Sequence, residues 1–231
     1  MNKPIRYLYH YTSIDSVLNI LTSQNLKFSN PSEFNDPYDC LPNIKNFGNN
    51  LRLFCQKGDF KIESNITNIS NVCVEKWTKE IGVCCFSKSY RKFLMWSHYA
   101  KKHTGVCLKF DISKDIGIFN QESIREIIYN KEIQFVDLNN IKNIIDLFDT
   151  YKFKAKNWEY EKEIRVFKEK EGLYKFNRKS LVSIYMGGKT EDHNIIDKIN
   201  FCCKKNVWGS KISLYKTNLS EDRYELKFEK I

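Results

Sequence analysis

The sequence predicts an α+β protein built on a mixed or antiparallel β-sheet with flanking helices. Segments with strand-like patterns outnumber helical ones, and the two kinds do not alternate regularly along the chain, as they would in a doubly wound parallel sheet. Aromatic residues make up 14% of the composition, which favours half-buried strands. The glycine-rich loops of dinucleotide-binding folds and P-loops are absent from the sequence, so we expect no nucleotide binding by those loops.

The bulk composition is that of one soluble domain. The 231 residues are 42% hydrophobic and 29% charged, without an apolar run long enough to cross a membrane or an apolar signal segment at the start. We therefore expect a single cytoplasmic domain over residues 1–231. The eight cysteines form no C-x-x-C pair, and we expect reduced thiols rather than disulfides or zinc. The net charge of +10 favours an anionic partner such as nucleic acid or ribonucleoprotein, although a composition rich in lysine and asparagine explains that charge equally well.

The strands are assigned from short apolar, aromatic or alternating segments bounded by turn residues. Residues 81–87 form a continuous apolar run typical of a central strand, and Val106, Leu108 and Phe110 alternate onto one face of the next. The full set of expected strands is 8–12, 26–29, 81–87, 105–111, 126–129, 132–137, 158–167, 181–188, 207–216 and 224–231.

The helices are assigned from apolar residues that recur on one helical face. Segment 14–21 has them at i, i+3, i+4 and i+7, and either Thr12 or Ser13 can cap its start. Further helices are expected at 66–77, 90–103, 138–155 and 192–204. We interpret the polar, asparagine-rich stretch within 43–80 as a variable helical insertion.

Three clusters contain more polar and aromatic side chains than packing requires. They are His10-Tyr11-Thr12-Ser13 with Asn35-Asp36-Pro37 behind it, Met95-Trp96-Ser97-His98-Tyr99-Ala100, and the segment from Trp158 to Arg165. The first two clusters also have purely structural interpretations. In the first, His10 forms a hydrogen bond at a strand–helix corner and Asn35-Asp36-Pro37 form a turn. In the second, Trp96 and Tyr99 pack in the core as aromatic residues of a helix.

The pattern of the third cluster predicts a strand with one charged face. Alternation over 158–167 would place these side chains on one side: Glu159, Glu161, Glu163 and Arg165. The other side would be apolar apart from Lys162. Neighbouring carboxylates repel one another unless a nearby cation offsets their charge. The face is therefore either a solvated salt ladder or a site that stabilises positive charge on a bound substrate.

Taken together, these motifs resemble the bacterial family of domains of unknown function 2971 (DUF2971). The resemblance is carried by L-Y-H-Y-T-S, F-N-D-P, M-W-S-H-Y-A with T-G-V-C-L-K-F-D, and W-x-Y-E-x-E-I-R, in that order. It runs from about Leu8 to the end of the chain and is weakest over 43–80. Because the family's function is unknown, this resemblance implies no activity.

A remoter resemblance is to ADP-ribosyltransferases of the His-Tyr-Glu type. Those enzymes carry His, Tyr and Glu in the order that His10, Tyr99 and Glu161-Lys162-Glu163 follow here. The resemblance implies a split, mixed sheet with NAD in the cleft. It also implies transfer of ADP-ribose from NAD to a protein or nucleic-acid acceptor, or hydrolysis of NAD, in toxin or anti-phage defence.

The same resemblance implies roles for individual residues. Glu163 would stabilise the oxocarbenium-like charge that develops when the nicotinamide–ribose bond breaks, and Glu161 would orient the acceptor nucleophile. Tyr99 would stack on the nicotinamide ring, with Trp96 supporting it. The other residues assigned to NAD binding are His10 (adenosine ribose), Tyr11, Thr12, Asn35, Asp36, His98 and Arg165, the last either keeping a glutamate ionised or reaching a phosphate.

Two other functions fit the sequence. A non-catalytic module on the same fold would bind nucleic acid or nucleotides through its positive charge and its aromatic side chains. A metal-dependent nuclease could use the three glutamates, but no Asp or His lies at a helpful local spacing, and we expect no metal.

Overall fold

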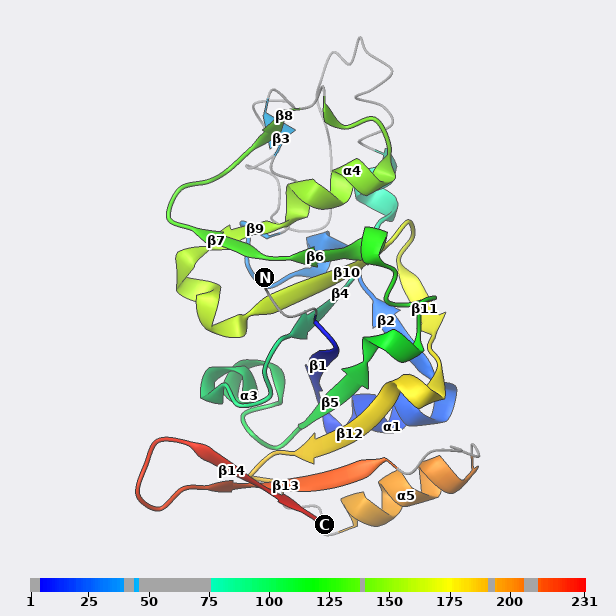
Figure 1. Cartoon of the computed structure of the whole chain (residues 1–231), viewed down its shortest axis with the longest axis vertical. Helices are drawn as coiled ribbons and strands as arrows, with labels where there is room; N and C mark the ends of the chain where they lie inside the picture. The colour runs from blue at the N-terminus through cyan, green and yellow to red at the C-terminus, as the bar shows by residue number, and fades with distance from the viewer. Residues whose placement is uncertain (1–4, 40–43, 46–75, 138–139, 191–193, 206–211) are drawn as a thin grey trace.

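The computed structural model describes residues 5–39, 44–45, 76–137, 140–190, 194–205 and 212–231. The predicted α+β class is confirmed, and the molecule is organised around one eight-stranded mixed sheet (Figure 1). In spatial order its strands are β14 (Leu226–Lys230), β13 (Ser213–Leu219), β12 (Leu181–Met186), β5 (Val106–Asp111), β1 (Tyr7–Thr12), β4 (Gly82–Ser87), β10 (Glu163–Lys168) and β6 (Ile124–Glu126).

Smaller sheets and short helices surround the main sheet. The two-stranded sheets are β2 (Asn25–Phe28) with β11 (Gly172–Lys175), β3 (Ile44–Lys45) with β8 (Val136–Asp137), and β7 (Ile128–Asn130) with β9 (Phe153–Ala155). The α-helices with defined bounds are α1 (Ile14–Ser23), α3 (Phe93–Tyr99), α4 (Ile144–Phe148) and α5 (Ile195–Lys205). In the described part of the chain no helix is long and apolar enough to cross a membrane.

Pairing within the main sheet is uneven. β12 and β13 are parallel, and the other neighbouring strands run antiparallel. β1 pairs with β5 along its whole length, and β4 does the same with β10. Between these two blocks, β1 and β4 are joined only at the pair Tyr9–Ser87. We call this place the β1–β4 junction, because two well-paired halves of the sheet meet there with little pairing.

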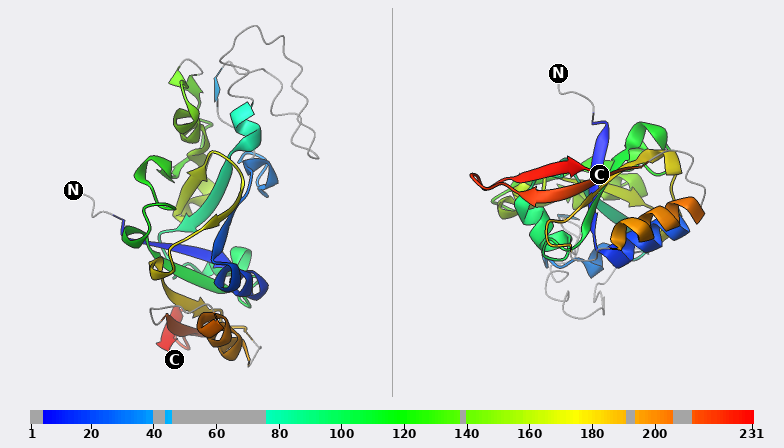
Figure 2. Two further views of the ribbon diagram at one scale, coloured as in Figure 1. Left: turned by 90° about the vertical axis from the view of Figure 1, so that its right-hand side faces the viewer. Right: turned by 90° about the horizontal axis from the view of Figure 1, so that it is seen from below.

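Helix α1 forms where the apolar spacing predicted it. Ser13 is its N-cap, with its side-chain oxygen accepting a hydrogen bond from the Ser16 amide at 3.1 Å. Its buried residues pack with those of α5 in the main core, and the two helices lie side by side (Figure 2). The opposite side of β1 contributes Tyr9 and Tyr11 to a second, aromatic core that includes Trp96 of α3.

Two predicted helices are shorter in the structure. The helix expected at 138–155 is confined to α4, which Asn143 begins by capping the amides of Ile145 and Asp146 at 2.8 and 3.1 Å. A 3₁₀ turn follows, and the chain then enters β9, because residues 153–155 pair with β7. The helix expected at 90–103 ends at Tyr99, and residues 101–103 all have positive φ.

Several other boundaries differ from the prediction. The strand expected over 132–137 is only β8, and β11 was not predicted. The strand expected over 207–216 is β13 from Ser213 onward, and its residues 207–211 lie outside the described residues. The helix expected at 66–77 and most of the insertion at 43–80 lie outside the described residues, although 76–80 are helical.

Candidate functional site

The segment 158–167 is a strand only in its second half. Residues Lys156–Glu161 form a 3₁₀ helix, and Lys162 takes the left-handed conformation (φ 46°) before β10 begins at Glu163. The backbone turns here because the Ser87 hydroxyl donates to the Glu161 carbonyl at 2.6 Å and the Lys88 amide to the Lys162 carbonyl at 2.9 Å. The prediction of one continuous charged face is therefore wrong.

The three glutamates of this segment consequently have different surroundings. Glu159 is exposed and pairs with Lys156 at 2.6 Å on the surface. Glu161 and Glu163 are buried, with 2% and 5% of their surface exposed. The preceding aromatic residues, Trp158 and Tyr160, are half-buried beside His98 and are not part of a continuous core face.

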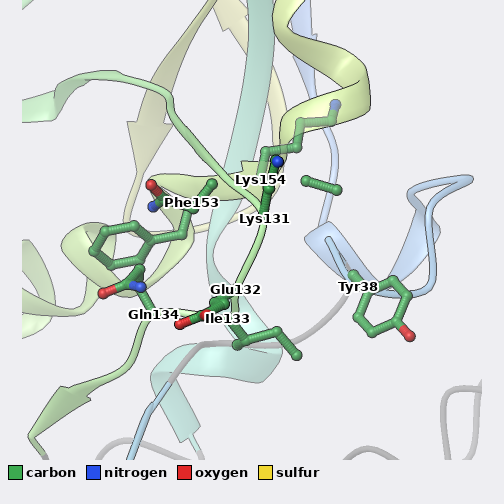
Figure 3. A pocket seen from close by; sticks show the side chains of 9 residues that line it. Tyr38, Lys131, Glu132, Ile133, Gln134, Phe153 and Lys154 are labelled. Carbon is green, nitrogen blue, oxygen red and sulfur yellow. The ribbon is translucent and has the colours of Figure 1, made fainter.

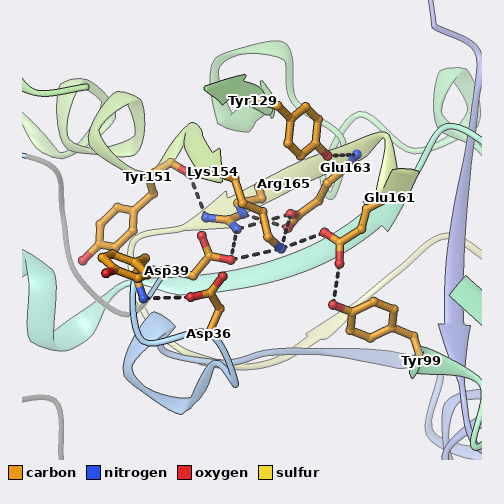
Figure 4. A network of polar contacts seen from close by, with 10 residues as sticks. Asp36, Asp39, Tyr99, Tyr129, Tyr151, Lys154, Glu161, Glu163 and Arg165 are labelled. Carbon is orange, nitrogen blue, oxygen red and sulfur yellow. Dashed lines mark hydrogen bonds and ion pairs between the residues drawn. The ribbon is translucent and has the colours of Figure 1, made fainter. Parts of the chain in front are cut away.

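Arg165 is buried behind Glu163 on the same face of β10. Its Nε donates to Glu163 Oε1 at 2.8 Å, its Nη1 to the Tyr151 carbonyl at 2.8 Å, and its Nη2 to Asp39 Oδ2 at 2.9 Å (Figure 4). With 1% of its side chain exposed, it satisfies its donors inside the protein. The guanidinium therefore lies against the Glu163 carboxylate and is enclosed by protein groups.

Lys154 of β9 connects the carboxylates of this cluster. Its Nζ lies 3.0 Å from Asp39 Oδ2, 2.7 Å from Glu161 Oε2 and 3.1 Å from Glu163 Oε2 (Figure 4). Only 7% of its side chain is exposed. A single ammonium group thus occupies the point where the three carboxylates meet.

Two tyrosines complete the polar network. The Tyr99 hydroxyl, at the end of α3, donates to Glu161 Oε1 at 2.5 Å. The Tyr129 hydroxyl of β7 accepts a hydrogen bond from the Glu163 amide at 2.8 Å. The side chain of Glu161 is therefore held by Tyr99 and Lys154, and that of Glu163 by Arg165 and Lys154.

Among the residues that the structure describes, Lys154 and Arg165 are the cations that pair with Asp39, Glu161 and Glu163. With three carboxylates and two cations, this buried cluster carries one excess negative formal charge. Burial alone would raise the pKa of Glu163, but the charges of Arg165 and Lys154 outweigh it and hold that pKa well below its usual range. Burial also raises the pKa of Glu161; Lys154 opposes this shift and the neighbouring Glu163 charge adds to it. The pKa values of the two glutamates are thus moved in opposite directions.

His10 approaches the cluster from the other half of the sheet. Its Nδ1 lies 3.0 Å from the Cys85 carbonyl, and because a carbonyl only accepts, Nδ1 carries the proton. Burial lowers the pKa of His10, so the ring is neutral at neutral pH. Its Nε2 is then an acceptor.

These side chains line one cavity at the β1–β4 junction, which we call the inner cavity. Its volume is about 170 Å³, and its walls include His10 and Tyr11 of β1 and Ser87 of β4. The polar residues around it include Asn35, Asp39, Tyr99, Lys154, Glu161, Glu163 and Arg165. A second cavity of about 720 Å³, the side cavity, shares His10, Phe34 and Cys85 with it and is also lined by Thr12.

Four residues assigned to NAD binding lie outside the inner cavity, and one of them, Thr12, lines only the side cavity. Trp96 is fully buried in the aromatic core, where its ring meets the edge of Tyr11 at 5.3 Å and its Nε1 donates to the Tyr90 carbonyl. His98 is exposed on α3. Asp36 accepts a hydrogen bond from the Tyr38 amide at 2.9 Å within its own turn, as an Asx turn does.

The sequence did not reveal the two residues that hold the cluster together. Lys154 was expected inside a helix, and Asp39 follows a turn more than a hundred residues earlier in the chain. Neither belongs to a local pattern. The metal-site hypothesis also fails geometrically, because Glu159 lies apart from the other two glutamates and an ammonium group already bridges the buried carboxylates.

Comparison with known proteins gives one match. A family model described as a protein of unknown function (DUF2971) matches residues 95–166. No curated protein and no solved structure matches the chain. The chain is therefore similar to DUF2971, a family without a known function, over a segment that runs from α3 to β10 and contains Tyr99, Glu161 and Glu163.

Proposed function

We propose that this protein cleaves the bond between nicotinamide and ribose in NAD and transfers ADP-ribose to a macromolecule or to water. The observation that carries the proposal is the convergence of His10, Tyr99, Glu161 and Glu163 on one cavity at the β1–β4 junction. These residues follow the His-Tyr-Glu order of ADP-ribosyltransferases. The weak pairing of β1 with β4, within one eight-stranded sheet, supports the proposal, because a split sheet is expected of that fold.

The charge of the cluster suits this reaction. The nicotinamide ring of NAD is positively charged, and when it leaves as a neutral molecule the positive charge moves onto the ribose. A cavity with one uncompensated buried carboxylate stabilises such a charge, more strongly than water does because the local dielectric constant is low. The aromatic residues Tyr9, Tyr11 and Phe34 in the walls add favourable contacts for a flat cation.

Glu163 and Glu161 have different roles in this reaction, because their surroundings shift their pKa values in opposite directions. Glu163, whose pKa is lowered, stays ionised and stabilises the positive charge on the ribose. Glu161, whose pKa is raised, is better suited to accept a proton from the attacking group. In the transfer step, an oxygen or nitrogen of the acceptor bonds to the ribose C1, its proton passes to Glu161, and nicotinamide leaves with the electron pair of the broken bond.

NAD is too long for the inner cavity alone, and the side cavity offers room for its adenosine half. His10 lies at the boundary of both cavities, where its Nε2 can accept a hydrogen bond from a ribose hydroxyl. Ser16, near the start of α1, lines the side cavity, so the pyrophosphate would lie near the positive end of that helix.

Release of nicotinamide from NAD by the purified protein tests the proposal. Glu163→Gln should lower the rate about 100-fold or more, the typical cost of removing one group that stabilises the transition state. Glu159→Gln is the matched control, because this exposed glutamate belongs to the same motif and should leave the rate unchanged. The proposal fails if NAD remains intact with the purified protein and with cell lysate as a source of acceptors.

The same assay separates the proposal from the non-catalytic alternative. A binding module would hold nucleic acid in a salt-dependent way without releasing nicotinamide, and Glu163→Gln would not change that binding. Its support is the net charge of +10.

A further inference from the structure

Strand β14 forms one edge of the main sheet. Among the described strands it pairs with β13 on one side and with none on the other, and the β13–β14 hairpin lies at the lower end of the molecule in Figure 1. The opposite edge strand, β6, has three residues, whereas β14 has five. Because an unpaired edge offers a row of backbone donors and acceptors to another strand, β14 is the better of the two edges for adding a strand.

The register of the hairpin shows which residues of β14 offer those groups. The Ser220 amide donates to the Glu225 carbonyl at 3.1 Å, and the Ile231 amide donates to the Leu214 carbonyl at 3.0 Å. In an antiparallel pair, such residues alternate with residues whose N–H and C=O point to the other side. The residues of β14 whose backbone groups point to the open edge are therefore Leu226, Phe228 and Lys230.

The side chains of β14 carry opposite charges on one face. Lys227 and Glu229 are exposed there, while Phe228 packs against the aromatic core on the other face. Lys227 Nζ lies 4.0 Å from an Asp222 carboxylate oxygen, and Glu229 Oε2 accepts a hydrogen bond from the Asn218 side chain at 3.4 Å. Both contacts are long, so each charge is open to a closer partner from another strand.

These positions restrict how two copies of β14 can pair antiparallel about a two-fold axis. The registers that align at least two outward-pointing residues of each copy are centred on Lys227, Phe228 or Glu229. Centring on Lys227 places two lysines opposite each other, and centring on Glu229 places two glutamates opposite each other, which is unfavourable. Centring on Phe228 aligns all the outward-pointing residues and places Lys227 of each copy opposite Glu229 of the other.

We propose that this protein forms a two-fold symmetric dimer by antiparallel pairing of β14 with the β14 of a second copy, centred on Phe228. The main sheets of the two copies then form one continuous sheet. Ion pairs between Lys227 and Glu229 form on one face, and the two Phe228 rings meet on the other, where cross-strand aromatic pairs add stability. Because both open edges are used, assembly stops at the dimer.

The dimer is independent of the proposed function. Among the described residues, those that line the inner and side cavities include none from β12, β13 or β14. The same holds for a third cavity, of about 280 Å³, between Tyr38 and Phe153 (Figure 3). The paired strands therefore contribute to none of these cavities, and dimer formation and nicotinamide release can be measured separately.

Sedimentation velocity over a range of protein concentrations tests the inference. The wild-type protein should contain a dimer whose fraction rises with concentration. Lys227→Glu places two glutamates opposite each other at both ion pairs, so it should weaken the dimer about 10-fold. Glu229→Lys should have the same effect through two lysines. The double variant Lys227→Glu/Glu229→Lys exchanges the two charges and should restore the dimer.

Two further variants separate pairing at this edge from general effects of charge. Lys175→Glu is the matched control, because this exposed lysine lies on β11, in a separate sheet, and its reversal changes the net charge equally. Its dimer should be as stable as that of the wild-type protein. Lys230→Pro removes an amide that points to the open edge, where proline is tolerated, and should weaken the dimer without loss of the β13–β14 pairing.

The outcomes decide the inference whether or not the protein is an enzyme. A protein that is monomeric at every concentration overturns it and leaves the edge to a strand of another protein. A dimer that survives both single reversals also overturns it, because a different surface must then hold the copies together. Loss of the dimer in the single variants without recovery in the double variant rejects the register. Recovery supports it and excludes unfolding as the cause of the loss.

Discussion

Glu161 and Glu163 are two residues apart in the sequence, but their carboxylates have different charged partners. The left-handed Lys162 ends the 3₁₀ helix and starts β10, so the two side chains reach the inner cavity from different backbone elements. Glu163 is bound by two cations, whereas Glu161 has Lys154 and the hydroxyl of Tyr99. One carboxylate is thereby stabilised as an anion and the other is destabilised.

This difference predicts opposite effects on stability. Glu161→Gln removes the excess charge of the cluster, so the free energy of unfolding at neutral pH should be unchanged or higher. Glu163→Gln weakens the pairing of the buried Arg165, and should lower the free energy of unfolding by about 3 kcal/mol. Urea denaturation of both variants measures the difference. Equal losses would mean that both glutamates serve only the fold.

The pH dependence of turnover should follow Glu161. Because its pKa is raised above the ordinary value of 4.5, the proton-accepting form, and with it kcat/KM, should increase as pH rises through that higher pKa. The Tyr99 hydrogen bond lowers the pKa of Glu161, so Tyr99→Phe should move the acidic limb of the profile to higher pH. A limb that stays in place would exclude Glu161 as the base.

At the scale of elements, local patterns predicted most of the framework. The helix at 14–21 and the strands at 81–87 and 105–111 were found near the predicted positions, because each buries one regular face or a whole segment in the core. The strand predicted at 158–167 is present only from Glu163 onward. Aromatic and acidic residues alternate there as they would in a strand, but hydrogen bonds from Ser87 and Lys88 turn the backbone instead.

From the sequence, only those residues of the candidate site that belong to motifs could be predicted. His10, Tyr99, Glu161 and Glu163 were found because they stand in recognisable clusters, and the structure brings all four to one cavity. Lys154 and Asp39 are an ordinary lysine and aspartate in the sequence. Only the pairing of β9 with β7 and the turn before residue 40 place them among the glutamates, so no local pattern reveals them.

The loop that ends α3 gives a prediction at the same scale. A Cβ added to Gly187 would lie 2.1 Å from the carbonyl oxygen of His103, in the left-handed stretch that follows the helix of Tyr99. Gly187→Ala should therefore displace this loop and lower the free energy of unfolding by about 2 kcal/mol. Gly117→Ala is the control, since its nearest contact would be an ordinary 3.6 Å. Thermal unfolding compares the two, and equal melting temperatures would contradict the prediction.

In the whole molecule, the candidate site depends on the contact between the two halves of the main sheet. One half supplies His10 from β1, and the other supplies Glu163 from β10 next to β4. The segment that matches DUF2971 contains Tyr99, Lys154 and both buried glutamates, while His10 and Asp39 come from residues before it. The cavity is therefore complete only when the N-terminal strand and its following turns are folded against that segment.

We propose that the excess negative charge of the cluster at the inner cavity binds the positively charged nicotinamide ring of NAD⁺. Titration with NAD⁺ and NADH tests it most directly, because the two dinucleotides have nearly the same shape and only NAD⁺ carries the ring charge. Rapid mixing with detection of tryptophan fluorescence would measure both affinities before turnover. The wild-type protein should bind NAD⁺ about tenfold more tightly than NADH, which corresponds to about 1.4 kcal/mol. Glu161→Gln should abolish this preference, and Glu159→Gln should retain it. Equal affinities of the wild-type protein for the two dinucleotides, or an unchanged preference in Glu161→Gln, would show that the charge of the cluster does not select the ring.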